Sequence, residues 1–389
     1  MSAPPAVPKG ARPAVRSMEG DAVSHLHGGP DAQGVPRWDF STNANACGPC
    51  PSALAAVQRA DAAHYPDPGY QLLRGALAAF HGVAAERIVV AGSASEFIAR
   101  LTAAVASGGG QRVWLPALAY GDYAHAAQAW GLARVDDPAQ ADLAWLCEPS
   151  SPCGVAEATA PAVADAAAVV LLDRAYEPLR LSGRCSLDAT ALDRVWQLWS
   201  PNKALGLTGV RGAYAIAPLQ GLALARRLDR LAPSWPLGAH AVAMLSAWVL
   251  PDAQHWLAQS RTLLARWKAL QLDLLQNAGW WCLPSEANYF CARAPFPVDV
   301  AALRARGIKL RDTTSLGLPA HWRLGVLPPD AQAALADALG DQSRRPVAVR
   351  PATKGSQVQG TRGTGFAGPP GASPHRGEDA QRRRGAFES

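Results

Sequence analysis

The chain has 389 residues, of which 49% are hydrophobic, so it can bury a large core and has the length of two or three domains. Its formal net charge of +6 comes from residues 343–389, which hold nine basic and three acidic residues, whereas the remainder carries 28 of each sign. This tail is rich in Gly, Pro, Ser and Arg, which predicts a disordered, solvated tail and disfavours a nucleic-acid-binding arm.

The first 20 residues lack the apolar core of a signal peptide, and we predict a disordered segment there. Seven scattered cysteines do not resemble a secreted disulfide framework, so we expect a cytoplasmic protein. The longest uncharged run, residues 231–251, contains Pro233, Pro236 and His240. It favours a buried helix after a turn over a membrane span.

Residues 45–54, "NACGPCPSAL", contain the CxxC spacing of thioredoxin-like redox centres. A helix predicted over 52–60 follows the two cysteines, so a helix-lowered thiol pKa is physically possible. A redox protein therefore stays open as one function for the chain, although a redox module would fill only part of its length.

Short apolar runs then alternate with longer Ala- and Leu-rich stretches. Strands are predicted over 87–92, 112–116, 142–149, 168–173 and 212–218, and helices over 95–108 and 253–279. This alternation predicts an α/β chain with a mostly parallel sheet, in which ligands bind at the carboxyl ends of the strands.

Two stretches place polar residues directly after predicted strands. The small residues of "AGSASE", 91–96, lead into a helix whose first backbone N–H groups could bind a phosphate, although Ser95 could equally be an N-cap. Asp173 closes the apolar run "AVVLLD" and requires a cationic partner, for which a salt bridge to a nearby arginine is the structural alternative.

The most informative stretch is "WSPNKALGLTGVRGAY", residues 199–214. A single lysine, Lys203, lies among small and apolar residues, where its amine can form a Schiff base. Arg211 can bind a phosphate through two hydrogen bonds. Together with Asp173 these residues supply what a pyridoxal phosphate site needs: an amine, a phosphate donor and an acid for the pyridine nitrogen.

This stretch resembles the Ser-x-Ser-Lys-x-x-Gly-Leu-x-Gly-x-Arg-x-Gly-Tyr element of fold-type I pyridoxal phosphate enzymes. The resemblance is to the class I/II aminotransferase branch that includes histidinol-phosphate aminotransferases and threonine-phosphate decarboxylases, and it covers about residues 25–335. It implies pyridoxal 5'-phosphate as cofactor, and a large domain with a mostly parallel sheet plus a smaller α+β domain. In that match Lys203 carries the cofactor, while Ser200, Asn202 and Arg211 hold its phosphate.

Further segments follow in the family's order. "GSASE" is similar to the phosphate-binding turn and "LPALAYGDY" to the segment with the ring that stacks on the pyridine. "DRAY" is similar to Asp-x-Ala-Tyr, in which the acid meets the pyridine nitrogen and the tyrosine the phenolic oxygen. The implied cofactor contacts are Ser93, Ala94, Ser95, Tyr120, Asp173 and Tyr176, and the implied catalytic residues are Lys203, Asp173 and Tyr176.

Two other segments bear on assembly and on a departure from the family. "HYPDPGYQLLR" resembles an element in which Tyr65 reaches the cofactor phosphate of the neighbouring subunit, which implies a homodimer with shared active sites. "EPSSPCG" stands where the family has Asn-Pro-Asn-Asn-Pro-x-Gly, so Ser151 replaces the asparagine that donates to the phenolic oxygen. A serine can still donate one hydrogen bond, but a weakened enzyme stays possible.

Two stretches favour the decarboxylases within this branch. "HLHGG" and "WDFSTNANACGP" resemble their N-terminal loop, with His27 and Asn43 as implied substrate contacts. There the two cysteines of "CGPC" are incidental. "KLRDTTSLGLPAHWRLGV" resembles the region of substrate-binding arginines, here Arg323 and, second, Arg311. The reaction so implied is decarboxylation of L-threonine O-3-phosphate to (R)-1-amino-2-propanol O-2-phosphate, a step of cobalamin biosynthesis.

The alternatives are an aminotransferase of histidinol-phosphate type, a non-catalytic relative and the redox protein. No metal, membrane or nucleic-acid partner is expected. The domains expected after the disordered residues 1–20 are an arm over 21–60 that adds to the small domain, a cofactor-binding domain over 61–250, a small domain over 251–342 and the basic tail 343–389.

Overall fold

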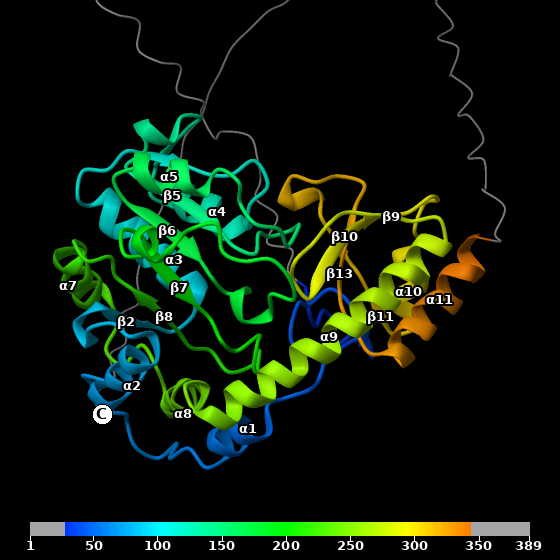
Figure 1. Cartoon of the computed structure of the whole chain (residues 1–389), viewed down its shortest axis with the longest axis horizontal. Coiled ribbons are helices and arrows are strands. Elements are labelled where there is room, and N and C mark those ends of the chain that lie inside the picture. Colours follow the sequence, from blue (N-terminus) through cyan, green and yellow to red (C-terminus); the bar gives the residue numbers. More distant parts are fainter. Residues whose placement is uncertain (1–27, 344–389) are drawn as a thin grey trace, which may run out of the picture. The chain divides into compact units, whose positions relative to one another are not determined.

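A computed structural model describes residues 28–343 of the chain (Figure 1). The predictions made for residues 1–20, for His27 and for residues 344–389 lie outside the described residues. Within residues 28–343 the strands form a seven-stranded sheet, a four-stranded sheet and a two-stranded sheet.

The largest sheet has its seven strands in the order β2-β8-β7-β6-β5-β3-β4. They are β2 (Ile88–Ala91), β3 (Arg112–Trp114), β4 (Ala133–Val135), β5 (Leu143–Cys147), β6 (Val170–Asp173), β7 (Trp196–Trp199) and β8 (Ala213–Ile216). Only β8 runs antiparallel to its neighbours among these strands. The α/β class with a mostly parallel sheet is therefore confirmed, and the five predicted strands are all present.

Helices cover both faces of this sheet, which is why its strands are apolar throughout rather than alternating. On β2, Val89 packs with α3, α4 and α7, whereas Ile88 faces α2 and α8 on the opposite side. The helices of this part are α1 (Pro51–Gln58), α2 (Gln71–His81), α3 (Ala94–Ala106), α4 (Gly121–Ala129), α5 (Ala160–Ala166), α6 (Ala189–Leu192), α7 (Leu222–Leu231) and α8 (Ala239–Trp248).

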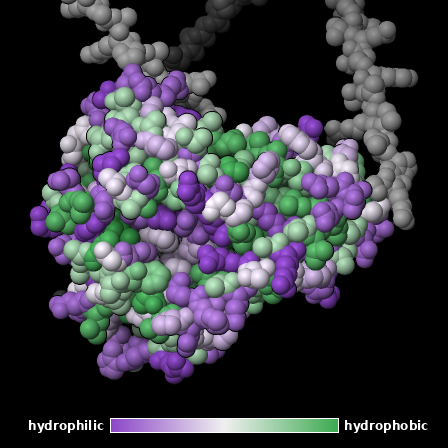
Figure 2. Space-filling view, viewed as in Figure 1, coloured by the Kyte–Doolittle hydropathy of each residue, from purple (hydrophilic) through white to green (hydrophobic). Residues whose placement is uncertain are grey.

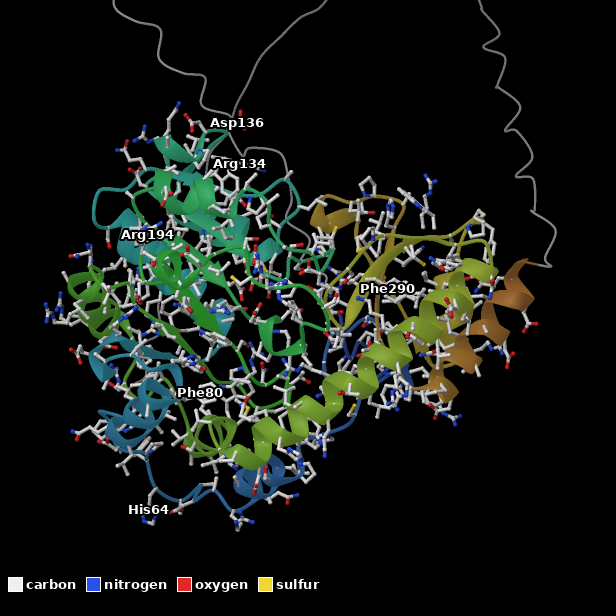
Figure 3. The ribbon with its side chains drawn as sticks, in the orientation of Figure 1. His64, Phe80, Arg134, Asp136, Arg194 and Phe290 are labelled. Atoms are coloured by element: carbon white, nitrogen blue, oxygen red, sulfur yellow. The ribbon has the colours of Figure 1, made fainter. Side chains whose placement is uncertain are left out.

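A second, antiparallel sheet with the order β12-β13-β10-β9 forms the smaller part. Phe290, on β10, lies in its core (Figure 3). The elements here are α9 (Pro251–Asn277), β9 (Trp281–Cys282), β10 (Tyr289–Arg293), α10 (Val300–Ala305), β11 (Ile308–Lys309), β12 (Arg311–Asp312), β13 (Trp322–Gly325) and α11 (Pro329–Ser343). The N-terminal arm joins this part, because β1 (Trp38–Asp39) pairs in parallel with β11.

Within residues 231–251 the chain turns and then forms α8, whose residues Met244, Leu245 and Trp248 are buried. No helix in the described residues is long and apolar enough to cross a membrane. On the face shown in Figure 2, hydrophilic and hydrophobic residues are interspersed.

His81 ends α2 in an apolar setting, where its Nε2 lies 2.7 Å from the hydroxyl of Tyr214 and its ring contacts Trp199. Burial, together with the nearby Arg174, lowers the pKa of His81 to about 4. Between about pH 6.5 and 4, His81 is therefore protonated in the unfolded chain and neutral in the folded chain.

We predict that this histidine reduces folding stability as the pH falls from about 6.5 to 4, by at most about 3 kcal/mol. His81→Gln stays neutral and can still hydrogen-bond to Tyr214, so its urea-unfolding free energy should decrease less over this range than that of the wild type. Parallel pH profiles for the two proteins would contradict the assignment.

Candidate active site

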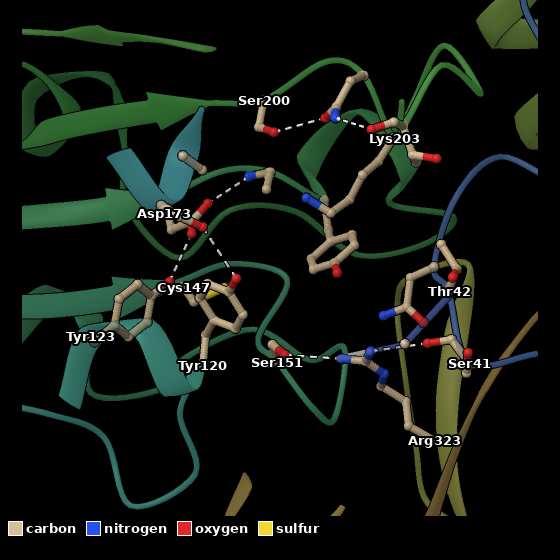
Figure 4. Close-up of a pocket in the computed structure, with 18 of the residues that line it drawn as sticks. Ser41, Thr42, Tyr120, Tyr123, Cys147, Ser151, Asp173, Ser200, Lys203 and Arg323 are labelled. Carbon is tan, nitrogen blue, oxygen red and sulfur yellow. Dashed lines mark hydrogen bonds between the residues drawn. The ribbon is translucent and has the colours of Figure 1, made fainter. Parts of the chain in front are cut away.

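A cavity of about 340 Å³ lies where the carboxyl ends of β2, β5, β6 and β7 meet the second sheet and the arm (Figure 4). Ligand sites of parallel sheets are expected at this edge, and the volume is within the ~300–1,000 Å³ of small-molecule sites. The lining residues include Gly28, Ser41, Thr42, Asn43, Ala94, Ser95, Tyr120, Tyr123, Cys147, Ser151, Asp173, Tyr176, Ser200, Asn202, Lys203, Thr208, Arg211 and Arg323.

Asp173 is the last residue of β6 and is only 4% exposed. Its carboxylate accepts hydrogen bonds from the backbone N–H of Ala175 at 2.9 Å and the hydroxyl of Tyr123 at 2.8 Å, and forms no ion pair with an arginine in the described residues. Burial raises the pKa of Asp173, which these hydrogen bonds and the charge of Lys203 only partly oppose. The carboxylate therefore lacks a close cationic partner and faces the cavity.

Lys203 lies in the turn that follows β7, and its side chain extends into the cavity (Figure 4). The Nζ is 5.3 Å from the centroid of the Tyr176 ring, which is held edge-on against Tyr289. The amine, this phenol and the Asp173 carboxylate therefore face the same space, as the sequence led us to expect.

The part of the cavity at the start of α3 can hold a phosphate. Ser93 is the N-cap of α3, accepting a hydrogen bond from the Glu96 N–H at 3.1 Å, and is not among the lining residues. Ala94 and Ser95, in the first turn, do line the cavity. Free N–H groups at this helix start can bind an anion, so Ser95 is a candidate contact and not the N-cap.

Three further predicted phosphate contacts come from the segment after β7. The Ser200 hydroxyl donates to Asn202 Oδ1 at 2.9 Å, which fixes both side chains at the cavity wall. Arg211 also lines the cavity. Tyr120 lies next to Ser95, with 3.4 Å between their hydroxyl oxygens, and burial raises its pKa.

The substrate side is formed by the second sheet and the arm. Arg323, on β13, donates to the hydroxyl of Ser151 at 3.2 Å and to the carbonyl of Ser41 at 3.4 Å. Arg311 lies directly opposite on β12 and donates to Ser315, but it is not among the lining residues. Burial and the charge of Arg323 lower the pKa of Arg311. Within residues 28–343 neither guanidinium forms an ion pair with a carboxylate.

Asn43 is 2% exposed, lines the cavity, and both polar atoms of its side chain lack a hydrogen-bond partner in the structure. A buried amide without partners costs about 1–3 kcal/mol per unsatisfied group, so this side chain points to a bound ligand. His27, the other predicted contact of this loop, lies outside the described residues.

Tyr65 lies away from the cavity and is 76% exposed. Its ring stacks on Trp235 with 4.3 Å between centroids, and the Trp235 indole donates to the Pro66 carbonyl at 3.0 Å. A role for Tyr65 in a neighbouring subunit stays a prediction.

Sequence reasoning did not single out Tyr123, Cys147, Thr208, Gly28, Ser41 and Thr42, which all line the cavity. The omission of Tyr123 matters most, because its hydroxyl bonds to Asp173 while its ring stacks on Trp145 with 4.8 Å between centroids. A signal was present, since Tyr123 lies one helical turn after Tyr120.

The "CGPC" stretch is not organised as a redox centre. All seven cysteines are free thiols. Burial raises the pKa of the Cys47 thiol, whereas a reactive thiol requires a lowered one. The segment instead packs along the turn that carries Lys203: the Cys50 N–H donates to the Leu205 carbonyl at 2.8 Å.

The residues fit pyridoxal phosphate on structural grounds. A protonated pyridine nitrogen would supply the cation that buried Asp173 lacks. The start of α3 with Ser200, Asn202 and Arg211 would hold the phosphate, and Lys203 offers the amine that carries the cofactor.

The sequence profile of aminotransferase class I and II matches residues 37–142 and 131–339. The chain belongs to this family. Histidinol-phosphate aminotransferase 1 of Thiobacillus denitrificans is 28% identical over 342 residues, covering 78% of this chain and 84% of its own. Among solved structures, the histidinol-phosphate aminotransferase of Sinorhizobium meliloti in complex with pyridoxal-5'-phosphate has a TM-score of 0.65 at 22% identity, covering 77% of this chain and 89% of that one.

A further solved structure is the L-threonine-O-3-phosphate decarboxylase of Porphyromonas gingivalis, with a TM-score of 0.67 at 19% identity, covering 79% of this chain and 99% of that one. At these identities the structures establish the fold alone. The fold-type I architecture is confirmed by these structures, and membership of the class I and II aminotransferase family confirms pyridoxal phosphate as the cofactor.

We predict that the purified holoenzyme has a visible absorption band from lysine-bound cofactor, which borohydride removes. Lys203→Ala should still bind cofactor non-covalently, because the other contacts remain, but borohydride should no longer attach the cofactor covalently to the chain. Lys268→Met is the matched control, since Lys268 is a second buried lysine, which donates to the Ser285 carbonyl outside the cavity. Cofactor that borohydride still attaches covalently to the Lys203→Ala chain would refute the assignment.

Proposed function

We propose that this enzyme decarboxylates L-threonine O-3-phosphate to (R)-1-amino-2-propanol O-2-phosphate, in the synthesis of the cobalamin linker. The observation that carries the proposal is the pair of buried, carboxylate-free arginines, Arg311 and Arg323, beside the arm residues Ser41 and Asn43. Two neighbouring guanidinium groups without a carboxylate partner favour an anion of more than one negative charge, such as a phosphate monoester, at the Arg323 side of the cavity.

Binding of the substrate phosphate, rather than its α-carboxylate, by Arg323 would also favour decarboxylation. An arginine bound to the α-carboxylate would stabilise the substrate, and that stabilisation is lost when carbon dioxide leaves. If Arg323 holds the phosphate instead, with the charge of Arg311 on the neighbouring strand adding to the field, the carboxylate has no ion pair to lose. The arm that resembles the decarboxylases supports this arrangement, because Gly28, Ser41 and Asn43 line the cavity next to Arg323.

When bound, pyridoxal phosphate accepts the electron pair of the bond that breaks at the substrate Cα. Asp173 would hold a proton on the ring nitrogen, and Tyr123 would hold Asp173 in place through its 2.8 Å hydrogen bond. Tyr120 would cover one face of the ring. The bond that breaks is the one held perpendicular to the ring plane, so the substrate's orientation by Arg323 and Asn43 would select the carboxylate.

Lys203 would have two tasks. Its amine would hold the cofactor before substrate arrives, and once displaced it would remain in the cavity, where it would return a proton to the substrate Cα after carbon dioxide has left. Tyr176, 5.3 Å from the amine by its ring centroid, would donate to the phenolic oxygen together with Ser151.

Transamination of histidinol phosphate is the second candidate. It is favoured by the names of the curated relatives, among them a histidinol-phosphate aminotransferase of Bradyrhizobium diazoefficiens that is 30% identical over 307 residues, covering 72% of this chain. The same phosphate-binding arginines and the same lysine would serve it, with Lys203 moving the Cα proton instead.

We also propose a homodimer with shared sites, in which Tyr65 reaches the cofactor phosphate of the partner subunit. The Tyr65 ring is exposed, stacks on Trp235 and does not line the cavity of its own subunit, which supports this arrangement.

The reaction is tested by incubating the holoenzyme with L-threonine O-3-phosphate, with and without a 2-oxo acid. We expect carbon dioxide release that needs no 2-oxo acid acceptor. Turnover that requires the acceptor and leaves the carboxylate in place would establish the aminotransferase instead.

Arg323→Ala and Arg323→Lys are the matched variants. Loss of a charge-assisted hydrogen bond of about 1.5–3 kcal/mol should raise the KM for phosphothreonine about 10- to 100-fold in Arg323→Ala. Arg323→Lys should recover part of this, because lysine keeps the charge without the planar fork. An unchanged KM in both variants would remove Arg323 from the phosphate site.

A further inference from the structure

The turn that carries Lys203 is hydrogen-bonded to the N-terminal arm. The carbonyl of Lys203 accepts a hydrogen bond from the Asn45 N–H at 2.9 Å, and the carbonyl of Ala204 accepts one from Asn45 Nδ2 at 3.0 Å. The third carbonyl, of Leu205, accepts one from the Cys50 N–H at 2.8 Å. Three successive carbonyls, beginning with that of the lysine, are thus bound to one segment, residues 45–50.

The side chain of Asn45 is held in the orientation that this hydrogen bond to Ala204 needs. Its side chain is only 3% exposed, and its Oδ1 accepts a hydrogen bond from the Cys47 N–H at 3.0 Å, which fixes the amide so that Nδ2 faces Ala204. The approach of the two backbones is so close that a Cβ on Gly206 would collide with the Gly48 carbonyl. Gly206 also has a φ of +66°, a conformation that favours glycine.

The same arm is attached at its other end to the substrate side of the cavity. The Gly325 N–H donates to the Phe40 carbonyl at 2.7 Å, and a Cβ on Gly325 would lie 2.6 Å from the Thr42 carbonyl. Asn288, next to β10, donates to the Ala44 carbonyl at 3.1 Å, and Arg323 donates to the Ser41 carbonyl. Residues 40–45 therefore connect the strand of Arg323 to the turn of Lys203 without interruption.

We infer that Asn45 is a positioning residue for Lys203: through its amide it fixes the turn that aims the Lys203 amine, and the arm transmits the position of the arginine strand to that turn. The inference rests on the proposed function only in taking Lys203 as the residue that carries the cofactor. Asn45 itself is not among the residues that line the cavity, so it acts through the lysine and not on the substrate.

The test uses the holoenzyme of Asn45→Asp, which keeps the size and the acceptor for Cys47 but loses the donor to Ala204. Cys47→Ser is the control, because this half-buried residue lies in the same turn, and the substitution replaces the thiol, which lies 3.9 Å from the Ser260 carbonyl, by a hydroxyl of similar size. The readouts are bound cofactor, its visible circular dichroism, the pH midpoint of its absorption band, kcat and KM.

We expect Asn45→Asp to bind cofactor, with a pH midpoint moved by about half a unit or more and weaker visible dichroism per bound cofactor. Its kcat should fall about tenfold or more, because a misplaced reacting group costs rate, while KM stays within about threefold. The Cys47→Ser protein should match the wild type in all readouts. A merely structural role would lower thermal stability without moving the pH midpoint.

Asn45→Ala, which loses both side-chain bonds but keeps the backbone bond to Lys203, is measured in parallel. A cofactor spectrum, pH midpoint and kcat like those of the wild type in either folded variant would overturn the inference. Failure of both variants to fold would overturn it too, since the arm would then be a folding element. The spectral readouts need no substrate, so they stand even if the enzyme does not turn over phosphothreonine. Absence of the band in the wild type would count against the proposed function instead.

Discussion

The burial of the Asp173 carboxylate is the constraint on which the site depends. A carboxylate at the end of a buried strand, bonded only to a backbone N–H and the Tyr123 phenol, has a raised pKa that the more distant charge of Lys203 only partly opposes, and within residues 28–343 it forms no ion pair. Such a group is costly unless a positive charge completes it. The stacking of Tyr123 on Trp145 and the surrounding apolar strands hold the carboxylate where the protonated ring of the cofactor can supply that charge.

The rest of the site is arranged around this point by two different parts of the fold. The large sheet places Asp173, Ser200 and Lys203 at one edge because its strands β6 and β7 run parallel. The small sheet brings Arg311 and Arg323 opposite each other by antiparallel pairing. The arm closes the gap between them, which requires glycine at positions 206 and 325, where the backbones approach closely.

The sequence predicted those parts of the site that are local along the chain. Asp173 ends a predicted strand and Tyr176 comes three residues later, so the parallel sheet brings both to one edge. Lys203 follows β7, which was not predicted as a strand, and was recognised instead from the small and apolar residues around it. The spacing of Tyr123 from Tyr120 was a local signal, but the hydrogen bond of Tyr123 to Asp173 depends on the packing of α4 against β5, which that spacing does not encode. The structure shows that Ser93, and not Ser95, caps α3. The sequence could not separate the two serines, because residue propensities do not fix a helix start to within one or two residues. The arm's contacts join residues about 160 positions apart, such as Asn45 and Ala204, and so are not visible in the sequence either.

The most direct measurement is the nitrogen-15 chemical shift of the cofactor's ring nitrogen, in holoenzyme reconstituted with labelled pyridoxal phosphate. In the wild type the ring nitrogen should be protonated, because Asp173 holds the proton, and in Asp173→Asn it should be neutral. The same shift in both proteins would mean that the buried carboxylate does not set the charge of the ring, and would contradict its central place in the site.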